Sequence, residues 1–140
     1  LLLIDDFNDA AATEATPMNI RSTVDTVNAP NSTIIGGVRN LTAVFQTSVL
    51  PDGRISCTVT GRSDSREGLF TLSADVGFQG DCESEYPIDA IEPLDLVEAQ
   101  CDCWYAQVER SDADTIVSFT ATNTNGDDLT STAQIEDLLN

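Results

Sequence analysis

Alternating apolar and polar positions recur along the chain in short runs, a period of two that is typical of half-buried β-strands. The clearest stretch is residues 34–60, in which two such runs, 41–49 and 55–59, flank a Pro-Asp-Gly turn at 51–53. Proline fixes the first turn angle and glycine accepts positive φ, so we predict that the two runs pair as a β-hairpin. The predicted inward positions are Leu41, Ala43, Phe45, Thr47 and Val49 on the first run and Ile55, Cys57 and Val59 on the second.

The same pattern predicts further strands on both sides of this stretch. They are expected at residues 1–4, 18–27, 69–78, 101–108, 114–122 and 129–135, the last two joined by an Asn-Gly turn. Residues 10–17 lack strong β preference and are predicted to form a loop or a helical turn. The Gly36-Gly37 pair predicts a bulge or a place where the backbone passes close to another segment.

Short strands separated by polar turns, with little helix, predict an all-β fold. We expect an antiparallel β-sandwich of the jelly-roll or immunoglobulin kind, with at most a short C-terminal helix. At 140 residues the chain has the size of one domain, so a single sandwich domain is expected over residues 1–140. No apolar run approaches the roughly 20 residues that span a bilayer, so no membrane insertion is expected. Residues 1–4 lack the basic flank of a signal peptide, and we predict that they form the first strand of a processed chain.

The charge balance narrows the choice of partners. The chain has 24 acidic residues, six arginines, no lysine and no histidine, which gives a net charge of -18. Nucleic acids and anionic membrane surfaces are excluded as partners because binding either requires many basic contacts. The acidity fits solubility in a salty or calcium-rich medium, or else cation binding. Residues 81–102 hold eight acids and no base, and we predict that they form an irregular, disulfide-anchored connection.

The missing residue types also exclude most catalytic chemistry. Without histidine or lysine, the Ser-His-Asp and Cys-His arrangements, Schiff bases and phosphate-binding lysine loops are unavailable. A pair of carboxylates could still hydrolyse glycosides, but nothing singles out such a pair among the 24 acids. We therefore predict no catalytic residue and a protein that is not an enzyme.

Calcium is the one metal that the residue types favour, because Ca²⁺ takes six to eight oxygen ligands in flexible geometry. The candidate ligands are Asp5, Asp6 and Asp9, with Asn8 among them; the alternative is a solvated acidic loop. The Asn123, Asn125 and Asp127 spacing resembles a calcium loop, but no glycine follows Asp127, so we predict a simple turn there. No other cofactor is predicted.

Four cysteines favour an oxidising compartment and a secreted, extracellular location. Their spacing does not match a structural zinc site, so two disulfides are expected among Cys57, Cys82, Cys101 and Cys103. Cys101 and Cys103 point the same way on a predicted strand and would close a strained ring. Each is therefore expected to pair with one of Cys57 and Cys82, in an order that the sequence leaves open.

Two surface features bear on carbohydrate. Asn31 and Asn40 begin glycosylation sequons, which have meaning only in a secreted eukaryotic protein. Trp104 and Tyr105 are predicted to face opposite sides of a strand, so that one ring could stack on a sugar; the alternative is that both are covered.

Four short motifs carry a family resemblance: Ile4-Asp5-Asp6-Phe7, residues 35–41 (IGGVRNL), residues 68–73 (GLFTLS) and residues 115–121 (TIVSFTA). In this order they resemble secreted bacterial β-sandwich surface modules of the kind that carry a C-terminal Pro-Glu-Pro sorting signal (PEP-CTERM-associated proteins). The Asp-Asp-Phe start is also similar to galactose-binding-like jelly rolls. The acidic, cysteine-bearing segment 81–103 is not part of that pattern. The resemblance implies an extracellular sandwich without a defined activity.

These observations together favour a secreted, non-enzymatic structural or assembly protein, a subunit of an extracellular filament, matrix or surface complex. Protein partners, including further copies of the chain, are expected. The alternatives are a calcium-stabilised carbohydrate-binding module, which would bind a glycan, and an accessory subunit of a larger complex.

Overall fold

The computed structural model describes residues 2–27, 33–47, 52–62, 67–111 and 114–135. Their regular structure is nearly all strand, as the sequence predicts, and every strand pairing is antiparallel. The strands are β1 (Ala11–Ala15), β2 (Arg21–Val27), β3 (Val38–Thr47), β4 (Ile55–Thr60), β5 (Leu69–Ala74), β6 (Gln79–Glu85), β7 (Thr115–Thr122) and β8 (Asp128–Ile135). Two short 3-10 helices, η1 (Ile35–Gly37) and η2 (Ile88–Ala90), accompany them.

Contacts between residues divide the chain into two compact units. One unit is Leu3–Glu92, called here the sandwich unit. The other combines Leu1–Leu2 with Pro93–Asn140 and is called the hairpin unit. The expectation of a single domain over residues 1–140 stays a prediction.

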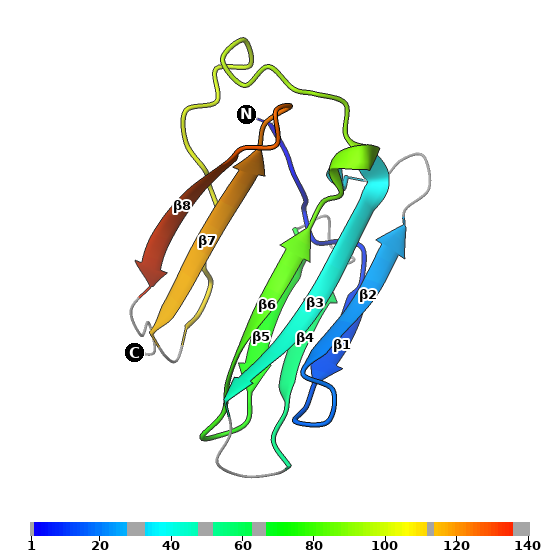
Figure 1. The fold of residues 1–140 in the computed structure, drawn as a ribbon, viewed down its shortest axis with the longest axis vertical. Helices are drawn as coiled ribbons and strands as arrows, with labels where there is room; N and C mark the ends of the chain where they lie inside the picture. The colour runs from blue at the N-terminus through cyan, green and yellow to red at the C-terminus, as the bar shows by residue number, and fades with distance from the viewer. Residues whose placement is uncertain (1, 28–32, 48–51, 63–66, 112–113, 136–140) are drawn as a thin grey trace. The chain divides into compact units, whose positions relative to one another are not determined.

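The sandwich unit consists of two three-stranded sheets with the orders β1-β4-β5 and β2-β3-β6 (Figure 1). The predicted hairpin of β3 with β4 is therefore wrong, because the two strands belong to different sheets. β3 pairs with β2 and β6, whereas β4 pairs with β1 and β5. The physical reason is burial: each strand has one apolar face, and placing the strands in opposite sheets brings those two faces together.

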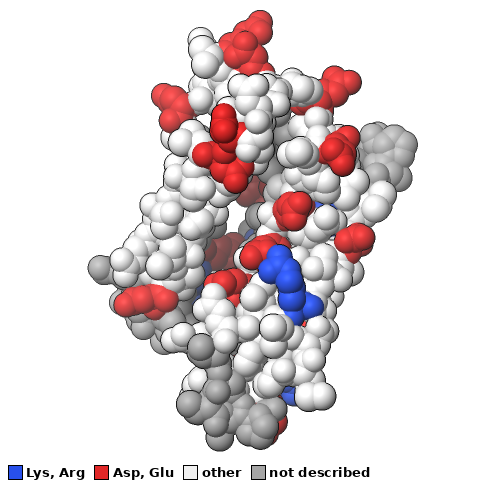
Figure 2. Space-filling view, in the orientation of Figure 1, with Lys and Arg blue, Asp and Glu red and all other residues white. Residues whose placement is uncertain are grey.

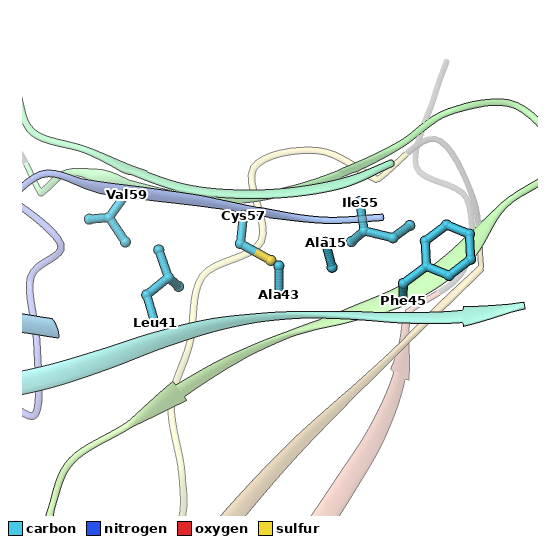
Figure 3. Close-up of a cluster of buried hydrophobic side chains, with 7 residues drawn as sticks. All are labelled: Ala15, Leu41, Ala43, Phe45, Ile55, Cys57 and Val59. Atoms are coloured by element: carbon cyan, nitrogen blue, oxygen red, sulfur yellow. The ribbon is translucent and has the colours of Figure 1, made fainter. Parts of the chain in front are cut away.

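The core lies between these two sheets and confirms the predicted inward positions. Leu41, Ala43 and Phe45 point from β3 toward Ile55, Cys57 and Val59 on β4, and Ala15 of β1 completes the cluster (Figure 3). All seven side chains are at most 7% exposed. The side chains of Thr47 and Val49 lie outside the described residues.

β1 and β6 occupy segments that the sequence assigned to irregular structure. β1 falls in the predicted loop 10–17, where small alanines fit against β4, and Ala15 is fully buried. Tertiary packing outweighs low β propensity here. β6 falls in the acidic segment 81–102, whose alternation of outward acids with Cys82 and Ser84 is that of a strand. The rest of that segment, apart from η2, is irregular as predicted.

Two other predicted strands are absent. Residues 2–4 and 101–108 contain no strand in the described structure, although the first stretch is continuously apolar and the second alternates in sequence. Ile4 instead makes a single backbone bond, accepting from Ile35 N at 2.8 Å. The strand expected at 18–27 begins at Arg21, and the one expected at 69–78 ends at Ala74, after which Val76 is 97% exposed.

The Gly36-Gly37 pair forms η1 with positive φ at both residues, and a Cβ on Gly36 would meet the Ala90 carbonyl oxygen at 2.7 Å. The predicted close approach of another segment is confirmed, and that segment is η2. Positive φ favours glycine because it has no Cβ.

In the hairpin unit, β7 and β8 pair along their whole length, from Thr115↔Ile135 to Thr122↔Asp128. The predicted Asn-Gly turn is confirmed: Gly126 has φ 87°, and the Asn123 side-chain oxygen accepts from the backbone N–H groups of Asn125 and Asp127. The expected terminal helix would fall at residues 136–140, outside the described part of the chain.

Candidate functional site

A buried ion pair joins the N-terminal segment of the sandwich unit to β3. Arg39 Nε donates to Asp5 Oδ2 at 2.7 Å, and both side chains are at most 1% exposed. Arg39 Nη1 also donates to the Asp9 carbonyl oxygen at 2.9 Å, and the guanidinium lies over the Phe7 ring. Each charge is therefore compensated inside the protein, as buried charges must be.

Tyr86 extends this network from the end of β6. Its hydroxyl donates to Asp5 Oδ2 at 2.9 Å and accepts from the Ser84 hydroxyl at 3.0 Å. Burial raises the pKa of Tyr86 well above 10, and the nearby Asp5 carboxylate acts in the same direction. The phenol therefore stays protonated and works as a hydrogen-bond donor.

Two of the three predicted calcium ligands, Asp5 and Asp9, take part in this network. Asp5 is held by Arg39 and Tyr86, and Asp9 contributes its backbone oxygen to Arg39. Asp6 accepts hydrogen bonds from Thr33 and Asn8. Burial raises the pKa of Asp6, but these hydrogen bonds outweigh it and hold the pKa below 3.8. Among the described residues, no group of three or more Asp, Glu, Cys or His is arranged to hold a metal ion, and the calcium site stays a prediction.

The disulfide joins the two sheets. Cys57 of β4 is bonded to Cys82 of β6, with a Cα–Cα distance of 5.6 Å, while Cys101 and Cys103 are free. The expected pairing of Cys101 and Cys103 with the other two cysteines is wrong. Cys57 and Cys82 are the inward residues of facing strands and meet across the core, whereas Cys101 and Cys103 lie in an irregular part of the hairpin unit.

Neither sequon gains a role from the structure. Asn40 lies within β3, half-buried between Asp25 of β2 and Glu85 of β6 in the strand register. Asn31 lies outside the described residues. Glycosylation at both positions stays a prediction.

The two faces of the β7–β8 hairpin differ in chemistry. Because directly paired residues share a face, one face carries Thr and Ser hydroxyls, with Thr120 and Thr130 hydrogen-bonded at 2.9 Å. The opposite face is largely apolar and consists of Val117, Phe119, Ala121, Leu129, Ala133 and Ile135, together with Thr115 and Ser131. Trp104 stacks on Phe119 with ring centroids 5.3 Å apart, so residues 93–111, which contain no strand and are called here the irregular segment, cover part of the apolar face.

This cover is incomplete. None of the described residues between 93 and 135 is buried. Leu129 is 72% exposed on the apolar face, and Val97 and Tyr105 on the irregular segment are 89% and 76% exposed. A two-stranded hairpin is at best marginally stable in water without further packing. The hairpin unit thus leaves much of its apolar surface exposed.

The irregular segment and the hairpin enclose a groove of about 320 Å³. Its lining residues are Leu94, Leu96, Ala121, Thr122, Asn123, Asp127, Asp128 and Leu129. The irregular segment is shaped nearby by a turn in which Asp95 caps the Glu98 N–H at 2.9 Å and Cys101 N donates to the Leu96 carbonyl oxygen at 2.8 Å. The groove, which we call the Leu–Asp groove, combines an apolar floor with two carboxylates.

Sequence reasoning missed Arg39, Tyr86 and the Leu–Asp groove. A signal existed for Arg39, because it shares the inward alternation of Leu41, Ala43 and Phe45 and is a base on an otherwise apolar face. No such signal exists for the groove, which brings together residues up to 35 positions apart. A chain segment without periodicity gives no indication of which residues it will cover.

In the comparisons with known proteins, no protein-family model, curated protein or solved structure matches the chain. The resemblance to secreted bacterial sandwich modules and to galactose-binding-like jelly rolls therefore stays a prediction. Within the described residues, no helix is long and apolar enough to cross a membrane.

Proposed function

We propose that the protein is a secreted, non-enzymatic structural subunit of an extracellular filament, matrix or surface complex, and that its hairpin unit makes the contacts with neighbouring subunits. The observation that carries this proposal is the contrast between a packed, disulfide-bonded sandwich and a hairpin without a buried residue in its described part. An inter-sheet disulfide supports an oxidising, extracellular setting.

The strand edges support the same proposal. Natural edge strands are protected from pairing with other chains by charges, prolines or bulges. In the sandwich unit, three of the four edge strands carry charges, among them Asp81, Glu83 and Glu85 on β6 and Arg21 and Asp25 on β2, whereas the edge strand β5 carries none. β7 has no charged residue, and β8 has only Asp128 at its start. The eight-residue strands β7 and β8 pair only with each other among the described residues, so they are suited to β-strand addition by a neighbour.

Sedimentation velocity over a range of protein and salt concentrations tests this proposal. At low salt the net charge of -18 opposes association of copies. Because salt screens this repulsion, we expect dimers or larger species to appear as ionic strength rises. Ala133→Asp should abolish them by placing a charge on the apolar face, outside the Leu–Asp groove. Val76→Asp, at an exposed apolar position of the sandwich unit, should have no effect.

A chain that remains monomeric at every salt and protein concentration, with and without calcium, would contradict self-assembly. Association that Val76→Asp weakens as strongly as Ala133→Asp would show that the hairpin unit is not the contact surface.

A carbohydrate-binding module is the second candidate, and the exposure of Tyr105 favours it. Aromatic rings with a free face stack on sugars, and Tyr105 is 76% exposed. A glycan array that includes acidic and neutral sugars tests this function. Binding should be lost in Tyr105→Ala, and an array without signal would exclude it.

A further inference from the structure

The Leu–Asp groove has a chemistry that the proposed assembly role does not by itself specify. Its floor is made by aliphatic side chains from both sides, Leu94 and Leu96 on the irregular segment and Leu129 on β8. At about 320 Å³ it lies near the lower end of the roughly 300–1,000 Å³ range of ligand pockets. A groove of this size takes one or two side chains of a partner rather than a folded element.

Two carboxylates lie at the hairpin end of the groove, Asp127 in the turn and Asp128 at the first residue of β8, on the hydroxyl face. Asp128 accepts a hydrogen bond from the Thr122 hydroxyl at 2.6 Å. Asp127 uses its backbone N–H and carbonyl in the turn, and none of the described residues pairs with its carboxylate. The lining contains no basic residue. An apolar floor next to uncompensated negative charge is complementary to a group that is both apolar and cationic.

The charge of the chain argues against a second copy of it as the partner that fills the groove. The sequence from 93 to 140 contains one base, Arg110, among its acids, and carboxylates are spread over the visible face of the molecule (Figure 2). A second copy at the groove would bring acid against acid, and an anionic lipid surface would be repelled in the same way. Charge complementarity therefore points to a basic protein partner.

We propose that the Leu–Asp groove binds a basic polypeptide segment in which an aliphatic side chain is flanked by arginine or lysine. The aliphatic side chain fills the floor between Leu96 and Leu129, and the cationic head groups pair with Asp127 and Asp128. This inference rests on the proposed function, since it assigns a partner class to the same hairpin unit. It adds that at least one neighbour in the assembly is a different, basic protein.

Isothermal titration calorimetry on the full chain tests the proposal with a ten-residue peptide of alternating leucine and arginine as the probe. The double variant Asp127→Asn/Asp128→Asn keeps the side-chain shape and removes both charges. We expect it to raise the Kd about tenfold, the sum of two exposed ion pairs. Leu129→Ser should raise the Kd by a similar factor because it removes part of the floor.

The matched control is Asp25→Asn/Asp52→Asn, which makes the same change in net charge at exposed positions of the sandwich unit. Its Kd should stay within about twofold of the wild-type value, because it alters only long-range attraction. A peptide with citrulline in place of arginine keeps the shape without the charge and should bind at least tenfold more weakly, at a salt concentration that leaves the arginine peptide bound.

The proposal is overturned if the control variant weakens binding as much as the groove variant, if the citrulline peptide binds equally well, or if no heat of binding is detected. Sedimentation of the chain without peptide distinguishes failure of the groove proposal from failure of the proposed assembly function. Salt-promoted association with no peptide binding would leave the assembly role and remove the basic partner.

Discussion

The sandwich unit and the hairpin unit differ in how their strands are held. In the sandwich unit, β3 and β4 face each other across a core whose side chains are at most 7% exposed, and Cys57–Cys82 joins their sheets. In the hairpin unit, β7 and β8 have a well-formed turn and complete pairing, yet none of its described residues from 93 on is buried. Regular backbone pairing therefore occurs in both units, whereas a core occurs in one.

We infer from this difference that the sandwich unit provides the stability of the fold and that the hairpin unit binds partners. Burial of apolar area is the main favourable term in folding, so the sandwich unit should supply most of the free energy of unfolding. The hairpin unit keeps its apolar side chains available, and this is the condition for binding a partner. Four expected outcomes test this division, in order of decreasing effect.

Arg39→Met should have the largest effect. It leaves the Asp5 carboxylate buried without its partner, and removal of one member of a buried ion pair costs about 3–5 kcal/mol. Arg21→Met, which removes the exposed pair with Glu83, should cost less than about 1 kcal/mol. Urea unfolding of both variants measures the two values. Equal costs would show that the Asp5–Arg39 pair is not buried in solution.

Ile55→Ala and Ile116→Ala compare the same substitution in the two units. Ile55 is fully buried on β4, so its truncation should cost about 2–5 kcal/mol through lost burial and a cavity. Ile116 on β7 is 68% exposed, and its truncation should cost about 0.5 kcal/mol or less. Thermal and urea unfolding give both numbers. A large cost at Ile116 would mean that β7 has a packed neighbour on that face.

Loss of the disulfide should have the next largest effect on the free energy of unfolding. The bond closes a loop between residues 25 positions apart, and its removal in Cys57→Ala/Cys82→Ala should lower the free energy of unfolding by about 3 kcal/mol. Cys101→Ala/Cys103→Ala should change it little, because these thiols are free. If the second variant were the more destabilised, the cysteines would be paired differently from the structure.

Tyr86 should make the protein sensitive to alkali. The folded-state pKa is raised, so its stabilising effect is present below the unfolded pKa of about 10 and is lost as pH rises above it. In that range the unfolded state releases the phenol proton and the folded state keeps it. The free energy of unfolding should therefore fall by up to about 1.4 kcal/mol per pH unit. Urea unfolding between pH 9 and 11 measures the slope, and Tyr86→Phe should remove this contribution; an unchanged slope would place Tyr86 in solvent.

The sequence predicts which face of a strand is buried more reliably than it predicts which strands pair. The period of two correctly identifies Leu41, Phe45 and Ile55 as inward, because a strand of either topology must bury the same side chains. It does not distinguish a hairpin from two strands in opposite sheets, since both arrangements show the same alternation. The β7–β8 hairpin is predictable because its Asn-Gly turn sets the pairing locally.

The candidate sites depend on contacts that no local pattern encodes. Asp5 and Arg39 are 34 positions apart, and the carboxylates of Asp5 and Asp6, two of the three acids that suggest calcium, accept hydrogen bonds from protein donors. Trp104 alternates with Ala106 as a strand would, yet it lies in irregular structure because it covers Phe119. Such coverage depends on the whole fold, so sequence alone could not reveal the Leu–Asp groove.

Hydrogen exchange measured strand by strand on the full chain tests the division between the two units most directly. Exchange rates report the local free energy of opening. The account predicts that amides in β3 and β4 exchange only through global unfolding, while amides in β7 and β8 exchange at least about a hundredfold faster and slow down when a partner binds. Protection of β7 and β8 equal to that of β3 and β4 in the free chain would contradict it.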